Sequence, residues 1–596
     1  MSEPAGPFLG VARSLAGKRW RQRGGDDRLG MALAQRLGIP EVMGRIIAAR
    51  GVGPDAVDRY LAPTLRDFLP DPDRLADMSL AAARLARAVR TGERIAVFGD
   101  YDVDGATSSA LLQRVLTALG AAVRVYIPDR RREGYGPNAA AFRLLRAEGA
   151  SLVVTVDCGT TAHAPLEEAR AIGLDVIVID HHAAEPLLPP AAALVNPNRL
   201  DDASGEGALA AVGVTFLVAV GLNRQLKADG WFATRPMPDL LQHLDLVALG
   251  TVCDVVPLQG LNRALVAQGL KVMAGRRNVG IAALADSAAV SERLDAYHLG
   301  YVLGPRVNAG GRVGRADLGC RLLATDDPTE ARRLAAELEL LNAERRGIEA
   351  EVLEQAIAQV ESQASGAGPV VIAEGADWHQ GVIGIVAGRL KERYNRPACV
   401  ITWEAGSGSG RGSGRSIAGV DLGAAIIAAR QAGHLSGGGG HRMAAGFSLA
   451  RDAFPGFAQF LAARIGAASR ETDPTPELGL DGVLQVPAAT PELCAMLAGL
   501  GPFGSGNAEP RFVLPGLRVI KADIVGTSHV RCILAPGAGP ERLKAIAFRA
   551  LESDLGRALL QSGGRALHVA GHLRADTWQG RNGVQLMVED AAFVEG

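Results

Sequence analysis

The sequence predicts a multidomain α/β protein with a mostly parallel sheet, a long connecting helix, a second α/β domain and a C-terminal β-barrel. Three observations predict it. Apolar strands alternate with helical segments over residues 94–195, one uninterrupted helical stretch follows residue 327, and short strands dominate after residue 474. Strand–helix alternation is typical of a parallel sheet with helices on both faces. A chain of 596 residues is too long for one core, so about three or four domains are expected.

Residues 1–90 are expected to form an N-terminal helical arm, because apolar residues between Leu33 and Leu61 follow a helical pattern. Within the arm, residues 37–40 (Leu-Gly-Ile-Pro) resemble the corner of a helix-turn-helix. Such a corner could belong to a DNA-reading helix or to helices that only pack together. Packing is the more common role, and it is the one we expect.

Residues 91–326 carry the strand–helix alternation. Apolar runs predict strands at 94–98, 122–127, 152–156, 176–179 and 193–195, with helices at 108–119, 139–147 and 162–172.

Residues 327–365 predict one helix that bridges two lobes, because almost no glycine or proline interrupts them after Pro328 at the first helical position. A second α/β unit is expected over 366–468, with strands at 369–373 and 398–402 around a helix at 381–394. Residues 474–596 predict a small β-barrel of short strands with one helix near 491–497.

Composition describes an ordinary globular protein, with 48% hydrophobic and 21% charged residues. No apolar run is long enough for a membrane span, and the N-terminus does not read as a signal peptide. Six dispersed cysteines without a CxxC pair argue against a disulfide framework or thiolate zinc site and suit the reducing cytoplasm. A net charge of −1 is not typical of a nucleic-acid-binding protein. If the substrate is a polyanion, the positive charge that binds it must be concentrated locally.

Acidic and imidazole side chains follow the ends of successive predicted strands. Asp100, Asp102 and Asp104 follow the first strand, Asp157 follows the third, and an Asp-His-His run with His181 and His182 follows the fourth; Asp254 follows an apolar helix. Parallel strands bring their carboxyl ends to one crevice. Carboxylates with imidazole and no cysteine suit Mn²⁺ or Mg²⁺ better than structural zinc.

Each residue alone has a simpler explanation. Asp157 could cap a helix, Asp254 could cap a turn, and adjacent histidines are more often surface residues than ligands. Their convergence on one crevice weakens these explanations together.

The ordered motifs Asp-Tyr-Asp-Val-Asp-Gly (100–105), Val-Asp-Cys-Gly (156–159), Asp-His-His (180–182) and Gly-Thr-Val-Cys-Asp-Val-Val-Pro (250–257) resemble the signature of the DHH phosphoesterase family. Within it, residues 305–312, 378–389, 412–416, 438–446 and 501–507 resemble the RecJ family of single-strand-specific exonucleases. The resemblance implies DHH, DHHA1 and OB domains at 91–326, 366–468 and 474–596. It also implies 5′-to-3′ degradation of single-stranded DNA to mononucleotides in repair and recombination. Residues 309–311 read Ala-Gly-Gly where many relatives carry Ala-Ala-Gly, a departure without expected consequence.

The resemblance further implies two ions. Asp102 and Asp104 would face different ions, Asp157 would bridge them, and His181 with Asp254 would complete the ligands of the second ion. His182 would lie nearer the scissile phosphate, whereas Asp100 could be a ligand or could orient one.

A substrate-binding set is also implied. Residues 412–416 offer backbone N–H groups, hydroxyls and a guanidinium, and the glycines at 437–440 let the backbone approach a nucleotide; the alternative for these glycines is a flexible loop. Two arginines are expected in a glycine-rich loop at 304–312. The expected substrate-binding residues are Arg130, Tyr135, Arg306, Asn308, Arg312, His379, Ser413, Arg415, Ser416, Gly439, Gly440 and His441. Phe503, Asn507 and Trp578 are candidate DNA contacts of the barrel, as are the rings of Phe512 and Phe548, although core packing is the commoner role for such aromatic residues.

Two alternatives remain at this point. The chain could be a DHH-family phosphodiesterase for short oligonucleotides, cyclic dinucleotides or pyrophosphate, or a non-catalytic scaffold for replication or repair. By analogy alone, we expect a monomer without membrane contact, whose partners include single-strand-binding protein and a RecQ-type helicase.

Overall fold

The computed structural model describes residues 6–130, 132–362, 368–469, 475–537, 539–576 and 583–594. The chain divides into two compact units, which are described separately. The larger unit comprises residues 68–474, and the smaller one joins residues 1–67 to residues 475–596. Among the described residues, no helix combines the length and the apolar character needed to cross a membrane.

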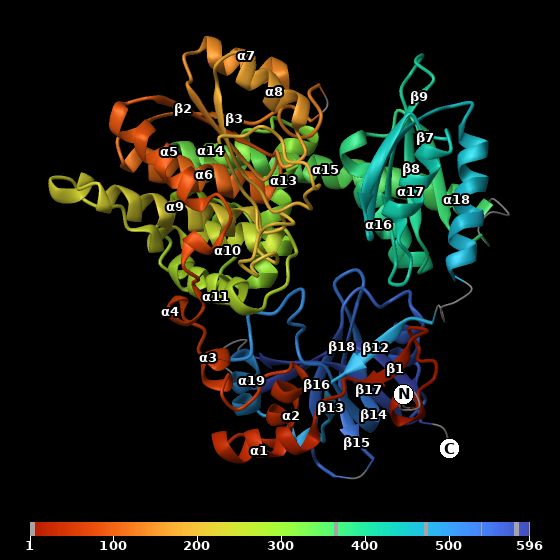
Figure 1. The fold of residues 1–596 in the computed structure, drawn as a ribbon. Coiled ribbons are helices and arrows are strands. Elements are labelled where there is room, and N and C mark those ends of the chain that lie inside the picture. The colour runs from red at the N-terminus through yellow and green to blue at the C-terminus, as the bar shows by residue number, and fades with distance from the viewer. Residues whose placement is uncertain are drawn as a thin grey trace. The chain divides into compact units, whose positions relative to one another are not determined.

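The larger unit begins with the predicted parallel sheet, whose strands lie in the order β3-β2-β4-β5-β6. Figure 1 labels β2 and β3 of this sheet and the helices α5 to α9. The strands are β2 (Arg94–Gly99), β3 (Ala122–Tyr126), β4 (Leu152–Val156), β5 (Asp175–Ile179) and β6 (Ala193–Val195). The helices around it are α5 (Met78–Thr91), α6 (Val103–Ala118), α7 (Ala139–Ala147), α8 (His163–Ala171) and α9 (Ala211–Ala228). Buried side chains of α7 and α8 share one apolar cluster with alternate residues of the strands, as expected for a sheet buried by helices.

A helical region follows the sheet. It contains α10 (Leu244–Cys253), α11 (Gly260–Ala274), α12 (Val279–Ser287), the π-helical turn η5 (His298–Leu303), α13 (Gly304–Val313) and α14 (Leu318–Ala324). The glycine-rich loop expected at 304–312 is wrong, because these residues form α13. Its glycines allow close packing: a Cβ on Gly304 would overlap Cys253, and one on Gly310 would lie 2.8 Å from the Arg315 carbonyl oxygen.

The predicted connecting helix is present as α15 (Pro328–Ser362). It contacts α12, α13 and α14 of the first lobe and α16 and β7 of the second. One continuous helix therefore links the two lobes of this unit.

The second lobe has a five-stranded sheet in the order β10-β11-β9-β8-β7. Its elements are β7 (Val371–Ala376), α16 (Gln380–Tyr394), β8 (Ala398–Trp403), β9 (Ser409–Arg415), α17 (Leu422–Gln431), β10 (Gly437–His441), β11 (Ala444–Ala450) and α18 (Phe454–Ser469). The alternative of a flexible loop is therefore wrong over β9 and β10, since both glycine-rich segments are strands.

The glycines of β9 have a packing reason. A Cβ on Gly410 or Gly412 would overlap the rings of Trp403 and Phe447, and one on Gly414 would lie 2.7 Å from Leu422. Because β9 pairs with β8 and β11 on both sides, its backbone is engaged in the sheet. Since strand residues alternate between faces, Ser413 and Arg415 share the face opposite these glycines.

The smaller unit is a sheet in the order β13-β14-β15-β16-β18-β17, which closes because β14 also pairs with β17. Its elements are β12 (Glu477–Leu480), β13 (Gly482–Val483), α19 (Pro491–Ala498), β14 (Phe512–Val525), β15 (His529–Pro536), β16 (Leu543–Ala547), α20 (Asp554–Leu560), β17 (Leu567–Asp576) and β18 (Gly583–Phe593). The expected helix near 491–497 is present, but a second helix, α20, was not expected and β14 is much longer than a short strand.

The N-terminal residues differ from the expected arm of 1–90. They form β1 (Arg19–Gln22), α1 (Asp27–Leu37), α2 (Glu41–Ala49), α3 (Val57–Leu61) and α4 (Leu65–Phe68), and β1 pairs with β12. Buried side chains of α1 and α2 belong to the same apolar cluster as Phe512. The helices at the 37–40 corner therefore pack on the barrel, as expected, whereas α5 contacts α9 in the larger unit.

Candidate metal centre

The site lies at the carboxyl ends of three neighbouring strands. Gly99 of β2 pairs with Val156 of β4, and Val156 pairs with Ile179 of β5. The next residue on each strand is an aspartate: Asp100, Asp157 and Asp180. The register of the sheet therefore aligns three carboxylates, as the sequence predicts.

The first motif bends directly into α6. Asp102 caps this helix by accepting a hydrogen bond from the Gly105 N–H at 3.1 Å. Asp104 is buried and accepts hydrogen bonds from the N–H groups of Ala211 (2.7 Å) and Val212 (2.9 Å) at the start of α9. Residue 105 has to be glycine, because a Cβ there would overlap the Asp100 backbone.

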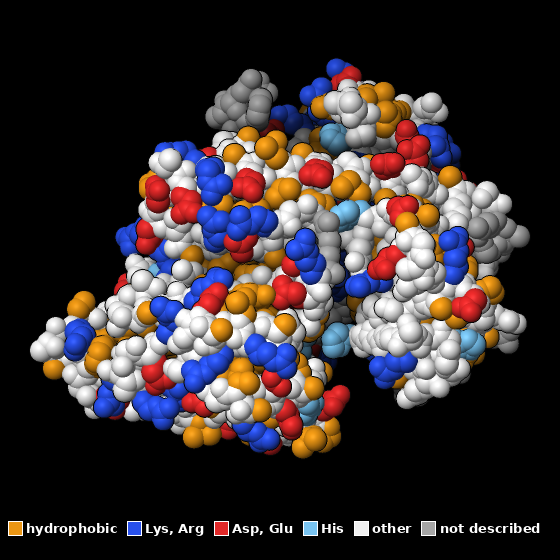
Figure 2. Space-filling view, turned by 90° about the horizontal axis from the view of Figure 1, so that it is seen from above, with side chains coloured by type: hydrophobic (Ala, Val, Ile, Leu, Met, Phe, Trp, Pro, Cys, Tyr) orange, Lys and Arg blue, Asp and Glu red, His pale blue; other side chains and the backbone are white. Residues whose placement is uncertain are grey.

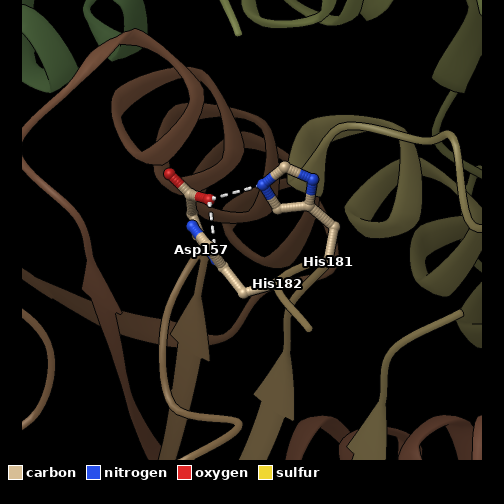
Figure 3. Close-up of side chains that lie close together, drawn as sticks. All are labelled: Asp157, His181 and His182. Carbon is tan, nitrogen blue, oxygen red and sulfur yellow. Dashed lines mark ion pairs between the residues drawn. The ribbon is translucent and has the colours of Figure 1, made fainter. Parts of the chain in front are cut away.

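His181 lies among the aspartates, as Figure 3 shows for Asp157. Its Nε2 is 3.4 Å from an Asp157 carboxylate oxygen and 4.0 Å from Asp104, and its Nδ1 is 3.6 Å from Asp254. Among the described residues, three groups place one ligand atom each within 4.8 Å of one another: Asp100–Asp102–Asp157, Asp104–His181–Asp254 and Asp157–His181–His182. The structure therefore brings together all six predicted ligands and His182.

Asp180 orients the two histidines, a role that sequence reasoning missed. Its carboxylate accepts hydrogen bonds from the His181 N–H (2.8 Å), the Thr160 N–H (3.0 Å), the His182 N–H (3.2 Å) and His182 Nδ1 (2.8 Å). The sequence could have indicated this role, because Asp180 directly follows a strand, as Asp157 does.

Asn196 and Asn198 hold the backbone of the same segment. The Asn196 amide donates to the His182 carbonyl at 2.8 Å, and Asn198 donates to the His181 carbonyl. Asn196 directly follows β6 at the same edge of the sheet, so the pattern that identified Asp157 could also have identified it.

Burial and repulsion between neighbouring carboxylates shift the pKa values of the aspartates in this site. Burial and the charge of Asp102 raise the pKa of Asp100, and burial and neighbouring carboxylates likewise raise the pKa of Asp104 and Asp157. Burial and the charge of Asp102 raise the pKa of Asp254 to about 7. A cation would relieve this repulsion.

Asp180 and His182 behave as a pair. Burial acts to raise the pKa of Asp180, but hydrogen bonds from His182 and Thr160 lower it to about 2. Burial acts to lower the pKa of His182, but the hydrogen bond and charge of Asp180 raise it to about 9.

The donor set fits a hard divalent cation. One carboxylate oxygen each of Asp100, Asp157 and Asp254 is buried without a hydrogen-bond partner among the described residues. The three groups consist of carboxylates and imidazoles. Oxygen ligands with imidazole suit Mn²⁺, and oxygen-rich sites also suit Mg²⁺.

A cluster of arginines lies beside the acidic groups. Burial and the charges of Arg130, Arg345 and Arg415 lower the pKa of Arg312 to about 10. Burial and Arg130 also lower the pKa of Arg415. Guanidinium groups that repel one another form a ready site for an anion.

Residues of α16 and β9 complete this cluster. Arg312 donates to the Gly381 carbonyl at 2.9 Å, and the N–H of Gly381 donates to His379 Nδ1 at 3.1 Å. Arg415 donates to the Ser413 hydroxyl at 3.2 Å. The structure therefore brings three arginines and two neighbouring polar residues together. We call this set the arginine cluster: Arg130, Arg312, His379, Ser413 and Arg415.

Tyr135 and Asn308 have different surroundings. The Tyr135 hydroxyl donates to the Asp157 carbonyl at 3.2 Å and is 3.4 Å from His182 Nδ1, so Tyr135 borders the metal groups. Asn308 lies half-buried on α13.

Arg306 and Ser416, which were also predicted to bind substrate, make hydrogen bonds within the protein. Arg306 pairs with Glu339 of α15 and donates to the Val302 carbonyl at 2.7 Å, so it anchors α13. Ser416 is buried and donates to the Val420 carbonyl at 2.9 Å. Gly439, Gly440 and His441 lie on β10, the edge strand of the second sheet.

Most of the described barrel residues that were expected to contact DNA pack inside the protein instead. Asn507 is buried, donates to the carbonyls of Leu500 and Pro502, and accepts from Arg50. Phe512 is a core residue and Phe503 packs against the same core, whereas Phe548 is exposed. Asn507 and Phe512 therefore stabilise the fold, and Trp578 lies outside the described residues.

Surface charge is mixed. On the face in Figure 2, basic and acidic side chains are interspersed without one large patch of either sign. Among the described residues, the arginine cluster is a local concentration of positive charge of the kind that a polyanion would need on a chain with a net charge of −1.

Comparison with known proteins agrees with this arrangement. The N-terminal domain of the DHH family matches residues 94–251, the DHHA1 domain matches 367–467, and the RecJ OB domain matches 480–590. The chain is 38% identical over 563 residues to the single-stranded-DNA-specific exonuclease RecJ of Dickeya dadantii, covering 92% of this chain and 96% of the relative. It is 37% identical to the same exonuclease of Escherichia coli, covering 93% and 96%.

Solved structures agree as well. The crystal structure of Thermus thermophilus RecJ with Mn²⁺ matches with a TM-score of 0.79 and 33% identity, covering 96% of this chain and 78% of that one. The structure of the same protein with Mg²⁺ matches with a TM-score of 0.74 and 31% identity, covering 96% and 77%.

Proposed function

The chain belongs to the RecJ family of single-stranded-DNA-specific exonucleases, and we propose that it hydrolyses single-stranded DNA from the 5′ end to mononucleotides in repair and recombination. Mn²⁺ or Mg²⁺ is its cofactor, as the relatives' metal complexes and the acidic groups of this chain support. The family matches also support a division into DHH, DHHA1 and OB domains at 91–326, 366–468 and 474–596.

The acidic groups divide between two ions. Asp100, Asp102 and Asp157 would hold one, and Asp104, His181 and Asp254 the other. Asp157 also belongs to the group with His181 and His182, which supports a bridging role. When bound, two such ions supply Lewis-acid stabilisation of phosphate charge and a nucleophilic water.

His182 acts on the scissile phosphate. Asp180 holds its Nδ1 at 2.8 Å, which leaves Nε2 directed elsewhere, and 36% of the side chain is exposed. Against the effect of burial, the hydrogen bond and charge of Asp180 raise the pKa of His182, which favours a protonated ring whose Nε2–H donates a hydrogen bond to a phosphate oxygen. Such a charge-assisted bond would strengthen as negative charge develops.

The arginine cluster holds the 5′-terminal phosphate. Arg312 and Arg415 come from different lobes, and each guanidinium presents several donors to one anion. A phosphate fixed there, beside the metal groups, would place one phosphodiester bond within reach of the ions. Cleavage would then start at an end and release mononucleotides.

One observation carries this proposal: His181 lies within 3.4–4.0 Å of Asp157, Asp104 and Asp254. The test is a time course on 5′-labelled and 3′-labelled single strands with Mn²⁺ and with EDTA. We expect labelled mononucleotide to appear at once from 5′-labelled DNA, late from 3′-labelled DNA, and not at all with EDTA. Asp157→Ala should abolish turnover while circular dichroism and melting show an intact fold.

Adding a dinucleotide substrate to this experiment separates the alternatives. Faster hydrolysis of a dinucleotide than of a long 5′-phosphorylated strand would favour a phosphodiesterase for short substrates. No turnover of either substrate with Mn²⁺ would favour a scaffold. Internal cuts in the long strand would contradict the arginine cluster as an end-binding site.

We further propose a cytoplasmic monomer that meets single-strand-binding protein and a RecQ-type helicase. All six cysteines are unpaired in the structure, which suits a reducing compartment. Light scattering tests the monomer, and pull-down with each purified partner tests the contacts.

A further inference from the structure

Tyr101 lies between the acidic groups and the arginine cluster. In sequence it separates Asp100 from Asp102, which belong to one candidate metal group. Its ring lies under the Arg130 guanidinium, whose Cζ is 5.0 Å from the ring centroid. This distance is within the range of a cation–π contact, so one residue touches both functional groups of the site.

The backbone of Tyr101 is fixed from the other side. A Cβ on Gly311 of α13 would lie 2.8 Å from the Tyr101 carbonyl oxygen and 3.2 Å from its Cβ. The helix therefore approaches Tyr101 as closely as a glycine allows, and the next residue on it is Arg312. The backbone of Tyr101 is thus packed against the helix that carries Arg312.

The ring is suited to hold a cation without competing for it. A tyrosine side chain is neutral at neutral pH, so the attraction of Tyr101 for Arg130 comes from the ring face, 5.0 Å from the Arg130 Cζ. Arg130 also repels Arg312 and Arg415, and the contact with the ring offsets part of this repulsion.

We propose that Tyr101 is a positioning residue that holds Arg130 in the arginine cluster at a set distance from the metal ligands, and thereby determines the preference for a 5′-phosphorylated end. The inference rests on the proposed function, because it assigns the anion of the cluster as the terminal phosphate of the substrate.

The test compares Tyr101→Leu, which removes the ring, with Tyr101→Phe, which keeps it. The control is Tyr394→Leu at the last residue of α16, which removes a ring beside Arg393 and Arg396. Since Gly384 of α16 lies beside Ser413 and Arg415 and Tyr394 is ten residues further along the helix, the end of α16 lies about 15 Å from the cluster. Each variant is titrated in EDTA with a fluorescent single strand carrying a 5′-phosphate or a 5′-hydroxyl, and Mn²⁺ binding is followed by electron paramagnetic resonance.

We expect Tyr101→Leu to weaken binding of the 5′-phosphorylated strand about tenfold, the scale of a partly desolvated cation–π contact, and to leave the 5′-hydroxyl strand nearly unaffected. With Mn²⁺ present, the loss should appear in KM more than in kcat. Tyr101→Phe and Tyr394→Leu should retain the preference, and all variants should bind Mn²⁺ as the unmodified protein does.

Three results would overturn the inference. One is an unchanged preference in Tyr101→Leu, and another is a Tyr101→Phe variant that loses the preference, since the hydroxyl would then be the active group. The third is weaker Mn²⁺ binding in Tyr101→Leu, which would make Tyr101 a support of the metal ligands. If the unmodified protein degrades single strands and any of these occurs, the inference fails alone; if it neither degrades them nor prefers a 5′-phosphate, the proposed function fails as well.

Discussion

Asp180→Asn isolates the orientation of the histidines from metal ligation. Asp180 belongs to none of the three candidate metal groups, yet its carboxylate accepts four hydrogen bonds from Thr160, His181 and His182. Asparagine has nearly the same shape but only one acceptor oxygen. One Asp180 oxygen accepts from the His181 N–H, the His182 N–H and His182 Nδ1, and an asparagine oxygen could take its place. The asparagine NH₂ group would then replace the other Asp180 oxygen and face the Thr160 N–H, which is 3.0 Å from that oxygen.

The magnitude follows from this count. One buried hydrogen bond is replaced by two opposed donors, at a cost of about 1–3 kcal/mol, and the bond to His182 loses its charge assistance. Loss of a group that orients a metal ligand typically lowers activity about 10- to 100-fold, or about 1.4–2.8 kcal/mol in activation free energy. We expect this loss in kcat/KM, smaller than the loss in Asp157→Ala.

The assay is hydrolysis of a 5′-phosphorylated single strand with Mn²⁺, together with thermal unfolding. The control is Asp421→Asn: Asp421 caps α17 by accepting from the Ala424 N–H at 2.9 Å, and asparagine caps a helix equally well. The reasoning is refuted if Asp180→Asn is as active as the control, or if it is as inactive as Asp157→Ala while still folded.

Three further predictions concern other parts of the molecule. Arg415→Ala should weaken the use of 5′-phosphorylated ends far more than Mn²⁺ binding, measured by competition between the two kinds of end; equal loss of both would contradict it. Asp590→Ala should lower the unfolding free energy of the smaller unit by about 3 kcal/mol in urea, because buried Asp590 accepts from Ser14, Ala16 and Trp20; an unchanged midpoint would contradict it. Burial acts to lower the pKa of His572, but the hydrogen bond and charge of Glu589 raise it, so its contribution to stability is complete below the unfolded pKa of about 6.5 and is lost as pH rises through the raised value. His572→Gln should therefore destabilise the protein more at about pH 6 than at about pH 9.5, and an equal effect at both would show that the charge of His572 is not involved.

The parallel sheet could be predicted because each of its strands is a short apolar run with a helix or a turn beside it. Leu152–Val156 and Ala193–Val195 have the predicted bounds, as does the helix Ala139–Ala147. These patterns are local, so sequence alone is enough to identify them. The long helix α15 was identifiable for the same reason.

The glycine-rich segments could not be predicted, because their structure depends on distant side chains. From sequence alone, Gly412 is typical of a loop. It is a glycine in a strand because the Phe447 ring packs against it in the folded chain. The N-terminal residues pose the same problem, since β1 pairs with β12 near the other end of the chain. Ser416 and Asn507 were wrongly expected to face substrate, because their internal partners become neighbours only in the folded chain.

The aspartates that sequence placed at one edge of the sheet differ in how the fold satisfies them, and this difference separates their roles. Asp180 receives four hydrogen bonds, which keep the pKa of this carboxyl near 2 despite burial. Asp100 and Asp157 each keep one buried oxygen without a hydrogen bond among the described residues, and burial and neighbouring carboxylates raise their pKa values. A buried carboxylate oxygen left in this way destabilises the folded chain, and a bound cation removes that cost. Among the three aspartates that follow β2, β4 and β5, Asp100 and Asp157 with their unsatisfied oxygens are therefore the ones suited to ligate, and Asp180 is the one suited to orient.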